Sequence, residues 1–199
     1  MTVTIEVVSF VAAPPARVFD LKLDVDVHAA SQRDSAETAA TRDDRRRLLL
    51  GDEVTFTARH FGLRWQMTSR ITTYQRPAPT GAAGSRPARS GGPDQQPGPD
   101  RSADPRPARF GEQPGPDPSA DAQAGRFVDE QVRGPFAMMR HEHLFEPDGA
   151  ATRMTDRMTF AAPLGPLGAV VARLVLAPYL RRLLIRRAAH LDMLVRSGG

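Results

Sequence analysis

Hydrophobic and polar residues alternate with a period of two along several segments of this 199-residue chain, as expected for β-strands with one buried face. The β-branched residues of VTIEVVSFV favour a first strand at 3–11. The alternation runs through 51–74 on both sides of Gly62, which predicts a hairpin. Three more strands are predicted between residues 126 and 162, in RFVDEQVRG, FAMMRHEHLFEPDG and ATRMTDRMTFAA.

Helical patterns are confined to the two ends of the chain. A short helix is predicted in PPARVFDLKLDV (14–25), which begins with prolines, and a second short helix within the Ala-rich segment 28–50. From Pro166 to Val195 the pattern is helical over about 30 residues, or about 45 Å, with a kink expected at Pro178. Only this helix is long enough to cover the apolar face of the sheet. We therefore predict one α+β domain over residues 1–199.

A proline- and glycine-rich segment interrupts that domain. Residues 77–125 hold 11 of the 18 prolines and include only one large apolar residue, Phe110, so they cannot bury enough surface to fold. QPGPDRSADPRPARF recurs as QPGPDPSADAQAGRF 17 residues later. We interpret 77–125 as a disordered insertion that grew by repeat expansion within a surface loop.

Composition excludes several functions. The absence of cysteine rules out disulfides, thiolate nucleophiles and Cys-ligated zinc. The basic start of a signal peptide is missing, and we predict a cytoplasmic protein. Of the 27 basic residues only Lys22 is lysine, which we attribute to the codon bias of a GC-rich genome. Residues 164–199 carry a net charge of +5, so the rest of the chain is close to neutral.

The basic terminal helix raises the question of its partner. Segment 162–180 is apolar, but its prolines, its glycines and Arg173 argue against a membrane span. Peripheral contact with anionic membranes is a second interpretation, after packing on the sheet. Exposed aromatic residues among the arginines and a glycine-rich phosphate loop are both missing, so we predict no nucleic-acid partner.

Alternation places a set of apolar and ionisable side chains on the inward face of the strands: Val54, Phe56, Ala58, His60, Trp65, Met67, Ser69, Ile71, Met139, His141, His143, Phe145, Met154, Asp156, Met158 and Phe160. A turn at 147–150 would pair residues whose numbers sum to 297. That register puts His141 opposite Asp156, with Cβ atoms about 5 Å apart.

This His–Asp pair has four interpretations. His141 and Asp156 are candidates for general acid–base catalysis, or they anchor a ligand, or they simply satisfy one another in the core. Together with His143 they also supply three potential metal ligands, but an HxH pattern alone is a weak signal. We predict no metal and no cofactor.

The strands and the segment before the terminal helix resemble the START-like, or SRPBCC, superfamily, and more narrowly bacterial ligand-binding proteins of the polyketide cyclase/dehydrase type. The resemblance is carried by GDEVTFTARHFGLRWQMTSRITTYQRP, RFVDEQVRGPFAMMRHEHLF and PLGPLG. It implies a helix-grip fold, in which a curved antiparallel sheet wraps the C-terminal helix and encloses a cavity. It also supports an inward position for Asp129 and Gln131, although alternation by itself favours the opposite face of that strand.

We therefore predict that a hydrophobic small molecule, lipid-, quinone- or polyketide-like, binds in this cavity. A non-covalent cyclase or dehydratase is the alternative, and the sequence leaves open whether any turnover occurs. The predicted ligand-binding residues are His60, Trp65, Met67, Asp129, Gln131, Met139, His141, His143, Phe145, Met154, Asp156 and Met158.

Overall fold

The computed structural model describes residues 1–31, 38–41, 44–60, 62–78 and 124–198. Seven strands form one antiparallel sheet in the order β1-β7-β6-β5-β4-β3-β2. They are β1 (Val3–Val11), β2 (Thr38–Thr41), β3 (Glu53–His60), β4 (Leu63–Gln75), β5 (Gly125–Arg133), β6 (Met138–Asp148) and β7 (Ala151–Ala161). The helices are α1 (Pro15–Lys22), α2 (Val25–Ala30), α4 (Gly165–Val171), the π-helical η2 (Ala172–Leu176) and α5 (Ala177–Ser197).

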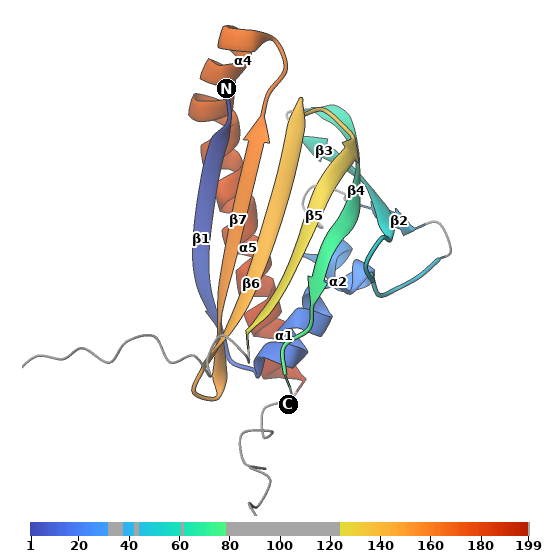
Figure 1. Cartoon of the computed structure of the whole chain (residues 1–199), viewed down its shortest axis with the longest axis vertical. Coiled ribbons are helices and arrows are strands. Elements are labelled where there is room, and N and C mark those ends of the chain that lie inside the picture. The colour runs from blue at the N-terminus through green and yellow to red at the C-terminus, as the bar shows by residue number, and fades with distance from the viewer. Residues whose placement is uncertain (32–37, 42–43, 61, 79–123, 199) are drawn as a thin grey trace, which may run out of the picture.

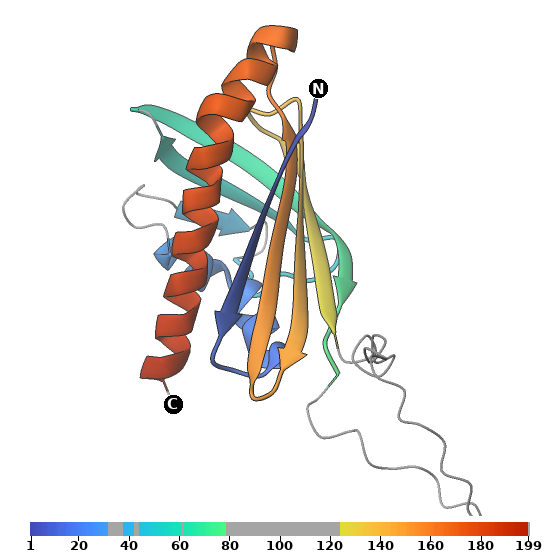
Figure 2. The same ribbon diagram turned by 90° about the vertical axis from the view of Figure 1, so that its left-hand side faces the viewer.

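The sheet is curved and α5 lies along its concave face. Figure 1 shows α5 behind β1, β7 and β6, and the turned view of Figure 2 shows the β3–β4 hairpin curling round toward the helix. Register shifts between Thr68 and Ser69 and between Ile71 and Thr73 interrupt the β4–β5 pairing. Irregularities of this kind bend a strand and increase its twist, so they account for the curvature at this point. The predicted helix-grip architecture is confirmed.

Most of the predicted insertion lies outside the described residues, because these exclude 79–123. Its two ends are described and lie side by side. Gln75 pairs with Arg126, and a Cβ added to Gly125 would stand 2.2 Å from Pro77 Cγ. The β4–β5 pair therefore closes at this point as a hairpin would.

The core on the concave face is built around Phe19 of α1, which is fully buried. Its ring makes edge-to-face contacts with Tyr74, Phe127 and Phe145, with ring centroids 5.2–5.6 Å apart. Leu191 of α5 belongs to the same buried cluster. Burial of one such phenyl ring contributes about 1.5–3 kcal/mol, so the cluster holds α1 and α5 on the sheet.

The terminal helix passes through Pro178 without ending. Proline lacks an N–H and cannot donate to the carbonyl four residues earlier. Directly before it, η2 adopts π-helical turns, and Ala177 N–H donates to Ala172 O, five residues back. The disruption expected at Pro178 therefore takes the form of a π-helical segment. No helix in the described part of the chain combines the length and apolarity that a bilayer crossing requires.

The register between β6 and β7 differs from the predicted one by two residues. Glu146 pairs with Arg153 rather than with Ala151, so His141 faces Met158 and His143 faces Asp156. The cause is the turn, which contains only Gly149 and Ala150; Gly149 has a φ of 61°. A left-handed glycine permits this tight connection. Because the shift is even, every inward side chain remains inward.

Candidate ligand cavity and buried charge network

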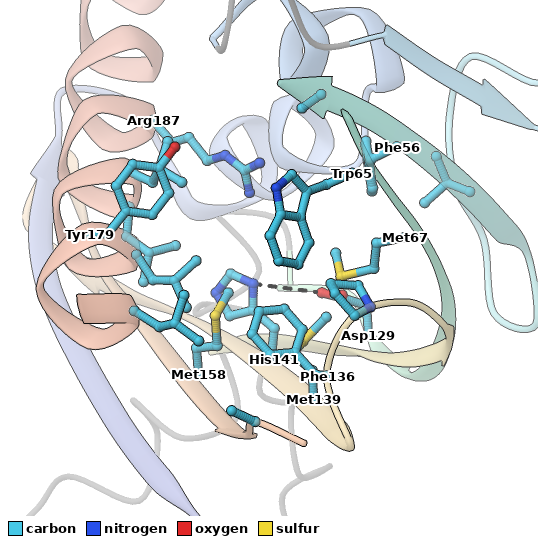
Figure 3. A pocket seen from close by; sticks show the side chains of 18 of the residues that line it. Phe56, Trp65, Met67, Asp129, Phe136, Met139, His141, Met158, Tyr179 and Arg187 are labelled. Carbon is cyan, nitrogen blue, oxygen red and sulfur yellow. Dashed lines mark ion pairs between the residues drawn. The ribbon is translucent and has the colours of Figure 1, made fainter. Parts of the chain in front are cut away.

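A cavity of about 490 Å³ lies between the concave face of the sheet and the terminal helix. This volume is within the range of about 300–1,000 Å³ typical of small-molecule sites. Figure 3 shows Phe56, Trp65 and Met67 on one side, Tyr179 and Arg187 of α5 on another, and Met139, His141 and Met158 from β6 and β7 below. The walls are mostly apolar, and the ionisable groups of β5 and β6 gather at one place with Lys22.

That polar place is a cluster of five ionisable side chains: Lys22, Asp129, His141, His143 and Asp156. Lys22 comes from α1, Asp129 from β5, the histidines from β6 and Asp156 from β7. Asp156 is fully buried and lies at the centre. Its Oδ1 is 3.0 Å from Lys22 Nζ, 2.6 Å from His143 Nδ1 and 3.2 Å from His141 Nε2. One carboxylate oxygen thus contacts an ammonium and two imidazoles.

His143 lies between two carboxylates. Its Nδ1 is 2.6 Å from Asp156 Oδ1 and its Nε2 is 3.1 Å from Asp129 Oδ1. A neutral imidazole has one N–H, so it can donate to only one of these two oxygens. The ring of His143 bridges the two carboxylates, and Lys22 supplies an ammonium to the same cluster.

These partners account for the charge state of Asp156. Burial alone would raise the pKa of its carboxyl, but Lys22 and then the two histidines outweigh burial and hold that pKa well below its usual value. Burial raises the pKa of Asp129, but the hydrogen bond from His143 and the electrostatic interaction with the neighbouring histidines outweigh burial, so this pKa is also lowered. Both groups are therefore carboxylates at neutral pH.

His141 is the neutral member of the cluster. Burial, and next the nearby His143, lower its pKa from 6.5 to about 4, and the two carboxylates offset only part of this effect. Its Nε2 has no hydrogen-bond partner among the described residues, since the 3.2 Å contact with Asp156 lacks hydrogen-bond geometry. A neutral imidazole on the cavity wall can donate one hydrogen bond and accept another.

The structure brings together seven of the twelve residues predicted from the sequence. The cavity is lined by Trp65, Met67, Asp129, Met139, His141, His143 and Met158. Asp156 lies behind the histidines, where it contacts both of them. The side chain of His60 lies outside what the structure describes.

Three predicted residues are placed elsewhere. Phe145 and Met154 are fully buried in the core cluster of Phe19 and are not among the residues that line the cavity. The amide of Gln131 donates from Nε2 to Phe136 O at 2.8 Å and accepts from Phe136 N–H at 3.3 Å. Gln131 therefore stabilises the connection between β5 and β6, and it is not among the residues that line the cavity.

Several lining residues were missed. Phe136 lies in a turn, and Tyr179 and Arg187 depend on how α5 is rotated against the sheet. Lys22 could have been singled out from the sequence, because it is the only lysine in a chain whose other basic residues, histidine aside, are arginines. Its side chain is only 7% exposed. A compact ammonium on a slim stem fits this buried position, whereas a guanidinium is wider and forked.

No family model and no curated protein matches the chain, but solved structures do. An aromatase/cyclase, Zhui, from Streptomyces sp. R1128 has a TM-score of 0.58 at 15% identity, over 96% of this chain and 92% of that one. A START superfamily protein from Mycobacterium smegmatis has a TM-score of 0.53 at 11% identity, over 98% and 99%. Norcoclaurine synthase from Thalictrum flavum, in complex with dopamine and hydroxybenzaldehyde, has a TM-score of 0.56 at 10% identity, over 100% and 89%.

At these identities the likeness establishes the fold. The chain has the same helix-grip fold as these solved structures, which is the fold that the family resemblance implied.

Proposed function

We propose that this protein binds a hydrophobic small molecule, lipid-, quinone- or polyketide-like, in the cavity between the sheet and α5. One observation carries the proposal: a cavity of about 490 Å³ has mostly apolar walls and few polar side chains, of which Asp129, His141 and His143 form one cluster. Apolar walls supply affinity, and few polar groups fix orientation. Three methionines, Met67, Met139 and Met158, suit a guest of irregular shape, since their side chains adapt to it.

His141 is the proposed anchor of the guest. Its ring is neutral at pH 7, since its pKa is about 4. It can therefore exchange hydrogen bonds with a carbonyl or hydroxyl of the guest without bringing a charge into an apolar cavity. Asp129 and His143 line the cavity beside it, but they already hydrogen-bond to each other. The guest we expect has one oxygen-bearing end and an otherwise apolar body.

A cyclase or dehydratase using the same cavity is the second candidate. The aromatase/cyclase and the norcoclaurine synthase among the similar structures support it by analogy of fold. In this chain His141 would take a proton from the guest while Asp156 holds the ring. A base with a pKa of about 4 is weak at neutral pH, because efficient general bases have a pKa near the working pH. The electrostatics of the cluster therefore favour anchoring over proton transfer.

The exposed side of the terminal helix supports contact with anionic membranes. Leu164, Leu167 and Leu174 are 77%, 65% and 73% exposed, although they are large and apolar. Leu164 and Leu167 also line the cavity, so the apolar patch reaches it directly. Arg173 lies within η2 beside the patch and is exposed. Leucines that enter the lipid and an arginine that faces the headgroups would bring the cavity to a bilayer.

Native mass spectrometry of protein purified from its own host tests the proposal. We expect one bound species per chain, released on unfolding, with a mass that identifies its chemical class. The variant Ala58→Phe, which adds a ring at a buried position of the cavity wall, should lose the species while remaining folded. A protein that is empty from its host and that also takes up no apolar compound after purification would contradict the proposal.

Turnover separates the two candidates. If the protein is a binder, His141→Gln weakens retention of the guest. If it is a cyclase, the same variant retains the guest and loses conversion.

A further inference from the structure

We infer that Asp129, His141 and His143 form a binding site for one divalent transition-metal ion on the wall of the cavity. One atom from each side chain contributes: Asp129 Oδ1, His141 Nδ1 and His143 Nε2. Potential ligand atoms of these three residues all lie within 4.8 Å of one another. The inference does not rest on the proposed binding of a hydrophobic guest.

The spacing of these atoms suits a single ion. Asp129 Oδ1 is 3.1 Å from His143 Nε2 and 3.8 Å from His141 Nδ1. With metal–ligand distances of about 2.1 Å, two ligands of one ion stand about 3.0–3.4 Å apart in octahedral or tetrahedral geometry. The two distances from Asp129 are therefore close to these values, and the imidazole nitrogens lie within 4.8 Å of one another.

The far side of the two imidazoles provides independent support. The nitrogens that would not bind the ion are both close to Asp156 Oδ1. His143 Nδ1 hydrogen-bonds to it at 2.6 Å, and His141 Nε2 lies 3.2 Å from it without hydrogen-bond geometry. Histidines that bind metals almost always direct their other ring nitrogen at a carboxylate or a carbonyl, which fixes the ring and its tautomer. Lys22, 3.0 Å from Asp156, holds that carboxylate in place.

The structure gives Asp129 the role of third ligand, which the sequence had suggested for Asp156. In the sequence, Asp156 is the candidate for the third ligand, and the HxH pattern is only a weak signal for a metal. The structure puts Asp156 behind the rings and places Asp129, from the neighbouring strand β5, beside the opposite nitrogens. Without an ion, Asp129 and His143 hydrogen-bond directly across this position.

The donor set indicates the class of metal. Two imidazoles and one carboxylate suit Zn²⁺, Fe²⁺, Co²⁺ or Ni²⁺, whereas Mg²⁺ and Ca²⁺ prefer sites built from oxygen alone. The three side chains come from two adjacent strands and all line the cavity. The remaining coordination positions of the ion would therefore be open to water or to an oxygen of a bound molecule.

Titration of chelator-treated protein with Co²⁺ and Zn²⁺ tests the site, with calorimetry and the visible absorption of Co²⁺ as readouts. We expect one ion per chain, and a loss of affinity of about tenfold or more in Asp129→Asn, His141→Gln and His143→Gln. His190→Gln on α5 is the matched control and should bind as the wild type does. Circular dichroism shows whether each variant is folded.

X-ray absorption at the zinc edge of the wild-type protein requires no variant. Two imidazole ligands in the spectrum would support the site. Spectra without imidazole, the absence of one-to-one binding, or equal affinity in a folded Asp129→Asn variant would overturn it. Binding of a hydrophobic guest is measured separately on metal-free protein. The metal site and the binding of the guest can therefore be contradicted independently of one another.

Discussion

Replacing Lys22 with methionine removes the ammonium that faces the buried carboxylate of Asp156 and keeps a side chain of similar length. Lys22 Nζ lies 3.0 Å from Oδ1 and 3.2 Å from Oδ2 of Asp156. The two side chains are 7% and 0% exposed. The variant therefore leaves Asp156 without its cationic partner from α1, while His143 still contacts it from β6.

The expected cost follows from the distance and the burial. At 3.0 Å and an effective dielectric constant of about 20, the attraction between two unit charges is about 5–6 kcal/mol. Removing the cost of burying the ammonium offsets part of this loss, and loss of one partner of a buried pair typically destabilises by about 3–5 kcal/mol. Because His143 still hydrogen-bonds to Asp156, we expect Lys22→Met to lower the free energy of unfolding by about 3 kcal/mol.

Urea unfolding followed by circular dichroism at pH 7.5 measures this change. The matched control is Arg70→Met, which breaks the ion pair with Glu53, whose side chains are 50% and 34% exposed. An exposed pair is worth less than about 1 kcal/mol. If Lys22→Met also lost less than about 1 kcal/mol, the reasoning that Lys22 balances the buried cluster would be refuted.

Three further predictions concern pH, the core and the membrane. The pKa of His141 is 6.5 in the unfolded chain and about 4 in the folded protein, so between pH 7 and pH 5 only the unfolded chain takes up the proton and the free energy of unfolding falls by about 2 kcal/mol. The variant His141→Gln should remove this dependence on pH in urea titrations. An unchanged dependence in that variant would contradict the prediction. Phe19→Ala should cost about 3–5 kcal/mol in the same assay, because the ring is fully buried against three others; a cost under 1 kcal/mol would argue against the described core. Co-sedimentation with anionic vesicles should decrease at high salt and in the double variant Leu167→Ser, Leu174→Ser, and equal binding by that variant would exclude the apolar patch as the contact.

Local alternation was enough to predict most of the sheet. The first strand, Val3–Val11, matches its prediction residue for residue, because each side chain meets either the core or solvent. The edge strand β2, Thr38–Thr41, was not predicted, since four residues with small side chains carry too little pattern. The β6–β7 register was wrong by two residues because both turns preserve the alternation. The left-handed conformation of Gly149 decides between them.

The same limits apply to the site. Alternation placed His141 and His143 inward, and family resemblance added Asp129, because strand faces depend on local sequence. Lys22 reaches Asp156 from a helix 134 residues away in sequence, a contact that only the packing of α1 on the sheet creates. Its identity as the lone lysine was visible, but composition did not reveal its partner.

Trp65 provides the most direct test of the central claim that the cavity receives a hydrophobic guest. It is the only tryptophan of the chain and it lines the cavity, so its fluorescence reports on what enters. Protein stripped of bound molecules should show a saturable change in emission, with one site per chain, when an apolar polycyclic or lipid-like compound is added. Emission that does not respond, or that changes in proportion to added compound without saturating, would contradict the account.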